Sequence, residues 1–178
     1  MVACAIDDNV QNHQLMLLHG AQGKGKSTFI RHLLPPELKD YYRNGMIIPE
    51  NNNHLLQLSS CLLINLDEFD TLSPERMQNL KSLITQDVVN ERKVYDIQNY
   101  TYIRRASFIA STNNPHCMPD VKENRRILFS TLLNIDYHTP VNHEGIYAQA
   151  YALYRQGFQY WYENQEITFL NNRNEAFR

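Results

Sequence analysis

Short apolar runs bounded by polar residues, glycine or proline recur along this sequence. Four of them have the length of buried strands, which usually span four to eight residues, whereas helices are longer. Buried strands that alternate with helical segments are typical of an α/β fold with a largely parallel central sheet. The four predicted strands are residues 15–18, 60–66, 106–111 and 126–133.

Between these strands the apolar positions recur every three or four residues, which predicts helices. One helix follows the first strand and ends at Pro35, since proline cannot continue a helix. Another begins at Ser73, a good N-cap residue, with Pro74 at the first helical position. The predicted helices are residues 28–34, 37–43, 74–84 and 144–164, and the asparagine triplet at 51–53 is predicted to be a loop.

The last predicted helix carries a stripe of aromatic residues. Residues spaced three and four positions apart lie on one face of a helix. Such a stripe is far more often a packing face than a base-stacking surface, so we expect it to pack against the rest of the domain. Its members are Tyr147, Tyr151, Tyr154, Phe158 and Trp161.

From Val88 to Ile103 the pattern changes to alternation, which predicts a β-hairpin with its tip near residues 96–99. Between residues 88 and 105 four cations outnumber two acids, and tyrosines interleave with them. Cations with aromatic rings suit a groove that binds single-stranded nucleic acid. A solvated hairpin with half of its aromatics in the core explains the same pattern, and both interpretations stay open. The cations are Arg92, Lys93, Arg104 and Arg105, the tyrosines are Tyr95, Tyr100 and Tyr102, and the expected DNA contacts are Arg92, Lys93 and Tyr95.

Composition narrows the class of protein. The chain has 178 residues, of which 43% are hydrophobic and 20% charged, and this is ordinary for one globular domain with a proper core. No apolar run approaches the length of a membrane span, and Asp7 and Asp8 interrupt any N-terminal signal peptide. Cys4, Cys61 and Cys117 lack metal-ligand spacing, so we expect free thiols in a cytoplasmic protein. A net charge of −2 confines any nucleic-acid contact to a local patch.

The turn after the first predicted strand fits the phosphate-loop pattern G-x-x-x-x-G-K-[ST]. Its glycines let backbone N–H groups turn inward around a polyphosphate, and the following helix adds partial positive charge. We expect Lys26 to reach the β- and γ-phosphates and Ser27 to ligate Mg²⁺. A glycine-rich turn that binds nothing is the competing interpretation, and the flanking strand and helix argue against it. The residues expected to hold ATP are Gly20, Ala21, Gln22, Gly23, Lys24, Gly25, Lys26, Ser27 and Thr28.

Polar residues also follow or precede the other predicted strands. Asp67 and Glu68 end the second strand in a Walker B pattern, so we expect Asp67 to hold Mg²⁺ and Glu68 to orient or deprotonate water. Asn113 follows the third strand, and we expect it beside the γ-phosphate, because ligands bind at the carboxyl edge of α/β sheets. An asparagine-rich turn explains it equally well. Arg125 and Arg126 precede the fourth strand, where an arginine can complete a neighbour's active site, although surface arginines are common.

Taken in order, these motifs resemble a known family. They look like the superfamily 3 helicase-type ATPases of the AAA+ class, and more closely the virulence-associated E family of primase-helicase-like proteins of phages and mobile elements. The resemblance covers roughly residues 13–135, and its ordered motifs are specific. The segments that carry it are residues 20–28, 65–69, 80–84, 90–95, 104–108, 111–113 and 124–126.

The resemblance implies a P-loop NTPase of the α/β class, with a central, mostly parallel five-stranded sheet and helices on both faces. A β-hairpin insertion and a C-terminal helix complete the expected fold. It also implies that Asn113 is a sensor residue and that Arg126, or Arg125, is an arginine finger in a homo-oligomeric ring such as a hexamer. We expect one domain from a longer protein, with residues 1–14 as lead-in, 15–135 as ATPase core and 144–164 as C-terminal helix.

The predicted function is hydrolysis of ATP with Mg²⁺, coupled to movement on single-stranded DNA during replication of a phage or mobile element. A non-translocating P-loop ATPase switch that controls assembly with a partner protein is one rival, and a metabolite kinase is a weaker one. Stimulation by single strands indicates a translocase, whereas slow hydrolysis that nucleic acid leaves unchanged indicates a switch. A kinase seldom needs the second carboxylate, Glu68, because its acceptor is not water.

Overall fold

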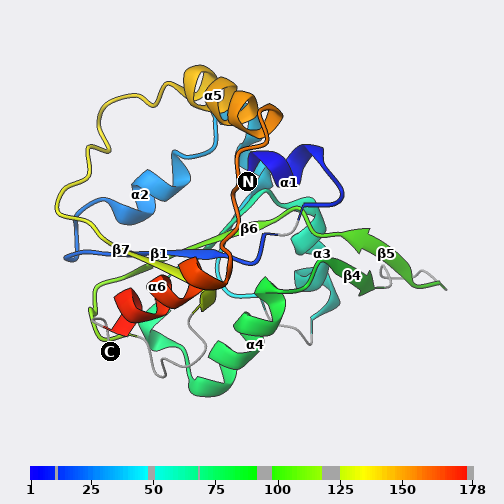
Figure 1. Ribbon diagram of the computed structural model, residues 1–178, viewed down its shortest axis with the longest axis horizontal. Coiled ribbons are helices and arrows are strands. Elements are labelled where there is room, and N and C mark those ends of the chain that lie inside the picture. The colour runs from blue at the N-terminus through cyan, green and yellow to red at the C-terminus, as the bar shows by residue number, and fades with distance from the viewer. Residues whose placement is uncertain (11, 48–50, 68, 92–97, 118–124, 176–178) are drawn as a thin grey trace.

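The computed structural model describes residues 1–178 apart from residues 11, 48–50, 68, 92–97, 118–124 and 176–178 (Figure 1). Five strands form the central sheet in the order β2-β3-β6-β1-β7, and every neighbouring pair is parallel. All five strands therefore end at the same edge, called here the carboxyl edge. The strands are β1 (Leu15–His19), β2 (Tyr42–Asn44), β3 (Leu63–Leu66), β6 (Ser107–Thr112) and β7 (Ile127–Thr131).

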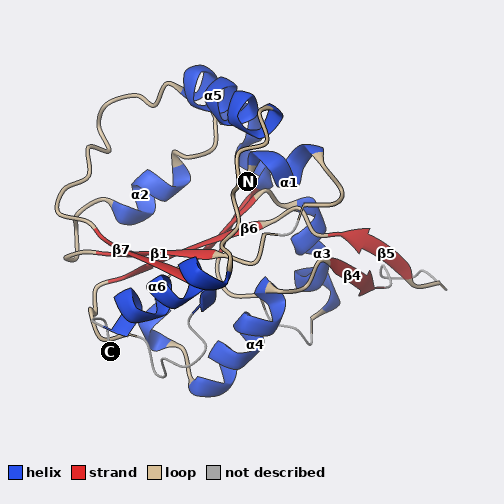
Figure 2. Cartoon of the chain, in the orientation of Figure 1, coloured by secondary structure: helices blue, strands red, loops and turns tan. Residues whose placement is uncertain are grey.

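Helices cover both faces of this sheet, as Figure 2 shows. Below the sheet in that view lie α3, α4 and α6, while α1, α2 and α5 lie above it. This confirms the predicted α/β class, the five-stranded sheet and the helices on both faces. The helices are α1 (Val2–Ile6), α2 (Lys26–Arg31), α3 (Asn52–Ser60), α4 (Pro74–Ile84), α5 (His143–Arg155) and α6 (Asn164–Asn174), with 3-10 turns η1 (Pro36–Tyr41) and η2 (Phe69–Thr71).

Alternate residues of the strands face two separate cores. Leu17 of β1 points toward α3 and α4, whereas the next residue, Leu18, packs with Ile30 of α2 on the opposite face. Since β3 and β6 are buried along their whole length, they appear in the sequence as short, largely apolar runs. This double burial explains why a simple apolar pattern predicted the central strands.

The edge strand β2 was not predicted. Residues 37–43 were predicted to form a helix, but the structure has the 3-10 turn η1 followed by β2, so that prediction is wrong at its end. The sequence Tyr42-Arg43-Asn44 has no apolar run, and the strand forms by pairing with Leu63–Asn65 of β3. A short, polar strand is typical of a sheet edge.

The asparagine triplet is also not a loop. Asn51 is the N-cap of α3, and its side chain accepts hydrogen bonds from the backbone N–H groups of Asn53 and His54. The predicted strand at 60–66 accordingly starts later, at Leu63. Asparagine favours turns in general, but it is equally suited to begin a helix.

The predicted hairpin is present. Strand β4 (Val88–Glu91) pairs antiparallel with β5 (Tyr100–Ile103) as a separate two-stranded sheet. It extends away from the body of the domain at the right of Figure 1. Residues 92–97, with part of the predicted tip, lie outside the described residues.

The single C-terminal helix predicted at 144–164 is wrong. Helix α5 ends at Arg155, and Gly157 has a φ of +76°, a left-handed conformation that favours glycine and ends the helix. Helix α6 then begins at Asn164. The packing predicted for the aromatic stripe is also wrong in part, because Phe158 and Trp161 are 56% and 49% exposed and Tyr151 is exposed too.

Candidate functional site

The loop between β1 and α2 lies at the carboxyl edge of the sheet, between the ends of β6 and β7. Gly23 and Gly25 have φ values of +76° and +80°, so both turn the backbone in a way that other residues rarely adopt. A Cβ atom on Gly25 would also lie 2.1 Å from Cδ1 of Tyr137. The loop therefore needs glycine at residue 25 for both conformation and space.

Lys26 occupies the centre of this loop with its side chain only 7% exposed. Its ammonium donates to the carbonyl oxygens of Gly20 (2.6 Å) and Ala21 (3.0 Å) and to Oδ1 of Asn113 (2.6 Å). Burial lowers the pKa of Lys26, while the charges of Asp67 and Asp70 oppose that change. The structure thus brings together two residues that lie 87 positions apart in sequence and that we expected near one phosphate group.

Asp67 follows β3 and connects the loop to β6. Its Oδ1 accepts a hydrogen bond from Ser111 Oγ at 3.0 Å and lies 3.4 Å from Ser27 Oγ. A carboxylate and a hydroxyl at this spacing fit Mg²⁺, which binds through one or two carboxylates together with phosphate and water oxygens. In the part of the chain that the structure describes, no group of three His, Cys, Asp or Glu residues could hold a metal ion by itself, so a metal here would need ligands from phosphate and water as well.

A cavity of about 530 Å³ opens over these groups. The loop residues from Gln22 to Thr28 line it together with Asp67 and Asn113. Gly20 and Ala21 contribute the carbonyls that hold Lys26. Sequence analysis missed five further lining residues. Two of them, Ser111 and Thr112, end β6 at this edge of the sheet, which was the signal that could have identified them. The five residues are Asp70, Thr71, Ser111, Thr112 and Tyr137.

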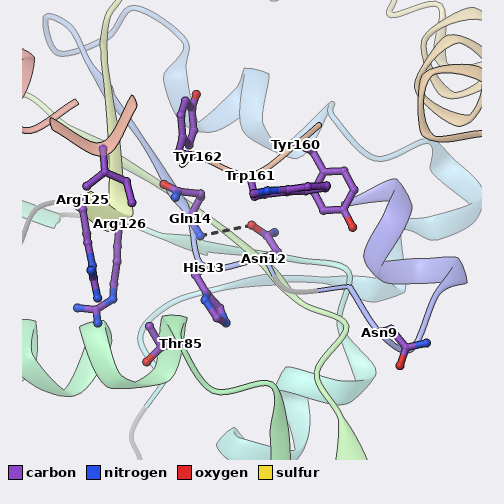
Figure 3. Close-up of a pocket in the computed structure, with 11 residues that line it drawn as sticks. Asn9, Asn12, His13, Gln14, Thr85, Arg125, Arg126, Tyr160, Trp161 and Tyr162 are labelled. Atoms are coloured by element: carbon purple, nitrogen blue, oxygen red, sulfur yellow. Dashed lines mark hydrogen bonds between the residues drawn. The ribbon is translucent and has the colours of Figure 1, made fainter. Parts of the chain in front are cut away.

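Arg125 and Arg126 do not join this site. They come immediately before β7, at the amino edge of the sheet, while Lys26 lies beyond the carboxyl end of β1. Both line a different cavity, shown in Figure 3. The structure thus places them at the opposite edge of the sheet from the Lys26 site of the same chain.

The remaining predicted residues fall outside the described part of the structure. These are Glu68, expected to act on water, and the expected DNA contacts Arg92, Lys93 and Tyr95. Their roles stay predictions.

Two of the four cations counted with the hairpin belong to the fold instead. Arg104 is only 6% exposed, and its guanidinium donates to the backbone carbonyls of Gln86, Ala106 and Asn12. Burial lowers its pKa. Arg105 donates to the carbonyl of Cys4 and pairs with a carboxylate, so neither arginine is an open phosphate contact. The hairpin therefore has less positive charge available for contacts with nucleic acid than the count of its cations suggested.

None of the helices described here has the length and apolar character needed to cross a membrane. The free thiols predicted at all three cysteines are confirmed, and all three are buried. Burial raises the pKa of the Cys61 and Cys117 thiols, which suits a structural rather than a reactive role.

Solved structures with the same fold are found. Two apo structures of the NrS-1 C terminal region (305–718) superpose with TM-scores of 0.50 and 0.51. Each is 16% identical in sequence to this chain, and each match covers 94% of this chain. The chain covers 34% and 36% of those two structures, so it spans about a third of their length.

No curated protein matches the sequence. A family model does, and it describes a virulence-associated protein E-like domain. Its match extends over residues 1–178, the full length of the sequence. On that match, and in agreement with the resemblance of the ordered motifs, this chain belongs to the virulence-associated protein E-like domain family.

Proposed function

We propose that this domain binds ATP with Mg²⁺ at the loop of residues 20–28 and hydrolyses it, and that a larger assembly couples hydrolysis to movement on DNA. The role in replication of a phage or mobile element follows from the family resemblance. One observation carries the proposal: the Lys26 ammonium, the Asn113 amide and the Asp67–Ser27 pair meet at one cavity on the carboxyl edge.

The contacts of Lys26 indicate how a phosphate would bind. Three oxygen atoms now hold its ammonium, and Asn113 supplies one of them from a different strand. A polyphosphate would offer charged oxygens to the same ammonium, and hydrogen bonds to charged acceptors are roughly twice as strong as neutral ones. The anion would also favour the protonated lysine, and so reverse the lowering of the pKa of Lys26 that burial causes.

Magnesium would bind between the loop and β3. Ser27 would supply a hydroxyl ligand and Asp67 a carboxylate, directly or through water, with the remaining positions left to phosphate oxygens and water. Mg²⁺ neutralises charge on the phosphates when it is bound. Glu68 follows Asp67 in sequence, and we assign it the task of orienting or deprotonating the attacking water.

The two arginines fit a role between subunits. Arg126 lies at the amino edge of its own sheet, so it cannot serve the Lys26 cavity of its own chain without a large rearrangement. A head-to-tail contact between copies would bring the amino edge of one domain to the carboxyl edge of the next, and such contacts close into rings. We propose a ring, such as a hexamer, in which Arg126 or Arg125 acts on the neighbour's ATP.

A second function, a non-translocating ATPase switch that controls assembly with a partner protein, is favoured by one observation. Arg104 and Arg105 are held by backbone carbonyls and by a carboxylate, which weakens the basic character of the hairpin. A switch needs the Lys26 cavity but no DNA contact. The same structure therefore supports ATP binding more strongly than translocation.

The experiment that separates these functions is the ATPase rate of the full-length protein with and without single-stranded DNA. We expect Mg²⁺-dependent hydrolysis that single strands stimulate. Slow hydrolysis that DNA leaves unchanged would favour the switch. Absence of ATP binding and hydrolysis in wild type and Lys26→Ala alike would contradict the proposal altogether.

A further inference from the structure

A second cavity, of about 510 Å³, opens at the amino edge of the sheet (Figure 3). Its walls come from the segment before β1, the residues before β7 and the connection between α5 and α6. Since Leu15 pairs with Ile127 in the parallel β1–β7 ladder, Gln14 and Arg126 start from neighbouring positions. The cavity has the size of a small-ligand site, for which 300–1,000 Å³ is typical.

Two positive charges line this cavity, those of Arg125 and Arg126. In Figure 3 the side chains of Arg125 and Arg126 extend in the same direction, toward Thr85 at the end of α4. Neither arginine has a hydrogen bond or an ion pair with any of the residues that the structure describes. His13 also lines the cavity, but its imidazole is held by Asp87 at 2.8 Å. Adjacent guanidinium groups repel each other, so an anion between them is favoured.

An aromatic wall faces the same space. Trp161 is 49% exposed, and its ring meets Tyr160 edge to face at a centroid distance of 5.1 Å and an interplanar angle of 86°. That contact uses the edge of one ring, and Trp161 lines the cavity beside the arginines. An exposed indole is a strong platform for a nucleobase, because every base has a π-face to stack on it.

A polar group without a partner completes the wall. The Oε1 atom of Gln14 is buried and accepts no hydrogen bond from the described residues, although buried polar atoms are nearly always paired. In Figure 3 the side chain of Gln14 lies between the arginines and Trp161. An amide in this position can accept from the N–H groups on the edge of a base.

We propose that this cavity binds a nucleotide. Its phosphate would lie against Arg125 and Arg126, its base would stack on Trp161, and the base edge would pair with the amide of Gln14. A carboxylate ligand would satisfy the arginines alone, whereas a nucleotide uses all three walls. Two sources supply this chemistry, a nucleotide within a single strand or the ATP held by a neighbouring copy, and the test separates them.

The sequence provides a built-in reporter. Trp161 is the single tryptophan of the chain, so all tryptophan fluorescence comes from this cavity. The test uses Lys26→Ala, which disables the phosphate loop and makes the result independent of the proposed ATPase. Fluorescence is titrated with ATP in one arm and with a thymidine oligonucleotide of about ten nucleotides, within the site size of single-strand binding folds, in the other.

We expect saturable quenching in at least one arm. Adding Arg125→Gln and Arg126→Gln should weaken that binding by about tenfold or more, because hydrogen bonds between ions are lost. Arg76→Gln is the matched control, since it removes a charge from an exposed arginine at the other end of α4, and it should leave the affinity unchanged. Tripolyphosphate should compete without quenching, because it has no base.

The two arms identify the source. Tighter binding of the oligonucleotide than of ATP assigns the cavity to a DNA strand, and the reverse assigns it to the neighbour's nucleotide. No saturable quenching in either arm would overturn the proposal, as would quenching that the double arginine variant leaves intact. Thermal unfolding of each variant shows whether a lost signal reflects the cavity or the fold.

Discussion

The cations at the two edges of the sheet differ in how many hydrogen-bond partners their own chain provides. At the carboxyl edge Lys26 is buried and donates to three oxygen atoms of its own chain. At the amino edge Arg125 and Arg126 have no such partner among the described residues. The first arrangement is complete within one domain and holds its lysine ready for an anion. The second has no anion among the described residues, and we expect another molecule to supply one.

This contrast follows from the chain's path. The residues of the Lys26 site follow the carboxyl ends of neighbouring parallel strands, so the sheet itself brings them together. The amino-edge cavity is assembled from segments that precede strands and from the α5–α6 connection. The β1–β7 ladder fixes Gln14 next to Arg126, whereas Trp161 comes from a connection outside the sheet. The predictions below test each edge, from the largest effect to the smallest.

The largest effect is expected at the carboxyl edge. Lys26→Ala should abolish tight ATP binding and hydrolysis, because it removes the cation at the centre of the phosphate loop. Glu68→Gln should instead leave binding intact and lower turnover by about 100-fold or more, as expected when a group acts only in the transition state. Binding is measured with a fluorescent ATP analogue and turnover by phosphate release. Wild-type turnover in Glu68→Gln would remove Glu68 from the proposed mechanism.

Lys26→Ala also leaves three acceptors without their donor, so folding needs its own control. The loop lies at a cavity that water can enter, and we expect the domain to remain folded. Circular dichroism and thermal unfolding of the variant would show this. A collapse of the fold would make the lysine a structural residue as well as a phosphate ligand.

The next largest effect tests whether the amino edge completes a neighbour's site. Arg126→Ala should bind ATP normally but hydrolyse it about 10³–10⁵-fold more slowly, the range for an arginine supplied to a phosphoryl-transfer site. Mixing this variant with Lys26→Ala should restore part of the activity. The Arg126→Ala subunit keeps a sound phosphate loop, and the other subunit supplies the arginine.

The mixing experiment belongs on the full-length protein under conditions where oligomers demonstrably form and exchange subunits. Absence of rescue there would reject the action of Arg126 on a neighbour. Arg125→Ala, tested in parallel, shows which of the two arginines acts. Arg76→Ala serves as the matched control for loss of a surface charge.

How much of the fold could be predicted depends on how local the signals are. The strands β1, β3, β6 and β7 were found because each contains a short apolar run. In β3 and β6 this run results from burial on both faces of the sheet. The glycine-rich loop of residues 20–28 could be recognised as a candidate site because the residues of its pattern are contiguous. Strand β2 could not be found in this way, since Tyr42–Asn44 becomes a strand through its pairing with β3.

The site was predictable to the same degree. Asn113 and Asp67 each follow a predicted strand, and the carboxyl ends of parallel strands share one edge, so both were expected near the loop. Tyr137 lies in the connection after β7 and packs on Gly25. No pattern in the sequence around Tyr137 predicts this contact. The helix break at Gly157 did have a local signal, a glycine at a helix end, but the regular aromatic spacing across it favoured one long helix.

A third prediction concerns an arginine that serves the fold. Arg104→Ala should lower the free energy of unfolding by about 3 kcal/mol, because it leaves the carbonyls of Gln86, Ala106 and Asn12 without a donor in a buried place. Urea denaturation measures this loss. Arg126→Ala should cost less than about 0.5 kcal/mol, the usual range for a surface change. Equal losses of unfolding free energy in the two variants would contradict the expected contrast between the buried Arg104 and the more exposed Arg126.

The smallest expected effect separates the hairpin from the amino-edge cavity as the place where DNA binds. Arg104 and Arg105 are engaged by backbone carbonyls and by a carboxylate of the domain. Arg92 and Lys93 are therefore the remaining cations of the hairpin segment. Each phosphate contact that is lost should flatten the dependence of log affinity on log salt by about 0.7 for a single strand. Arg92→Ala with Lys93→Ala should therefore reduce the slope by about 1.4 if both contact phosphates.

The double variant of Arg125 and Arg126 removes the same charge from the other region and should be measured across the same salt series. A slope that falls only for the hairpin variant assigns the strand to the hairpin and leaves the amino edge to the neighbour's ATP. A fall only for the Arg125/Arg126 variant assigns the strand to the cavity beside Trp161. An unchanged slope in both variants would remove both regions from DNA binding, and with them the structural support for translocation over the switch.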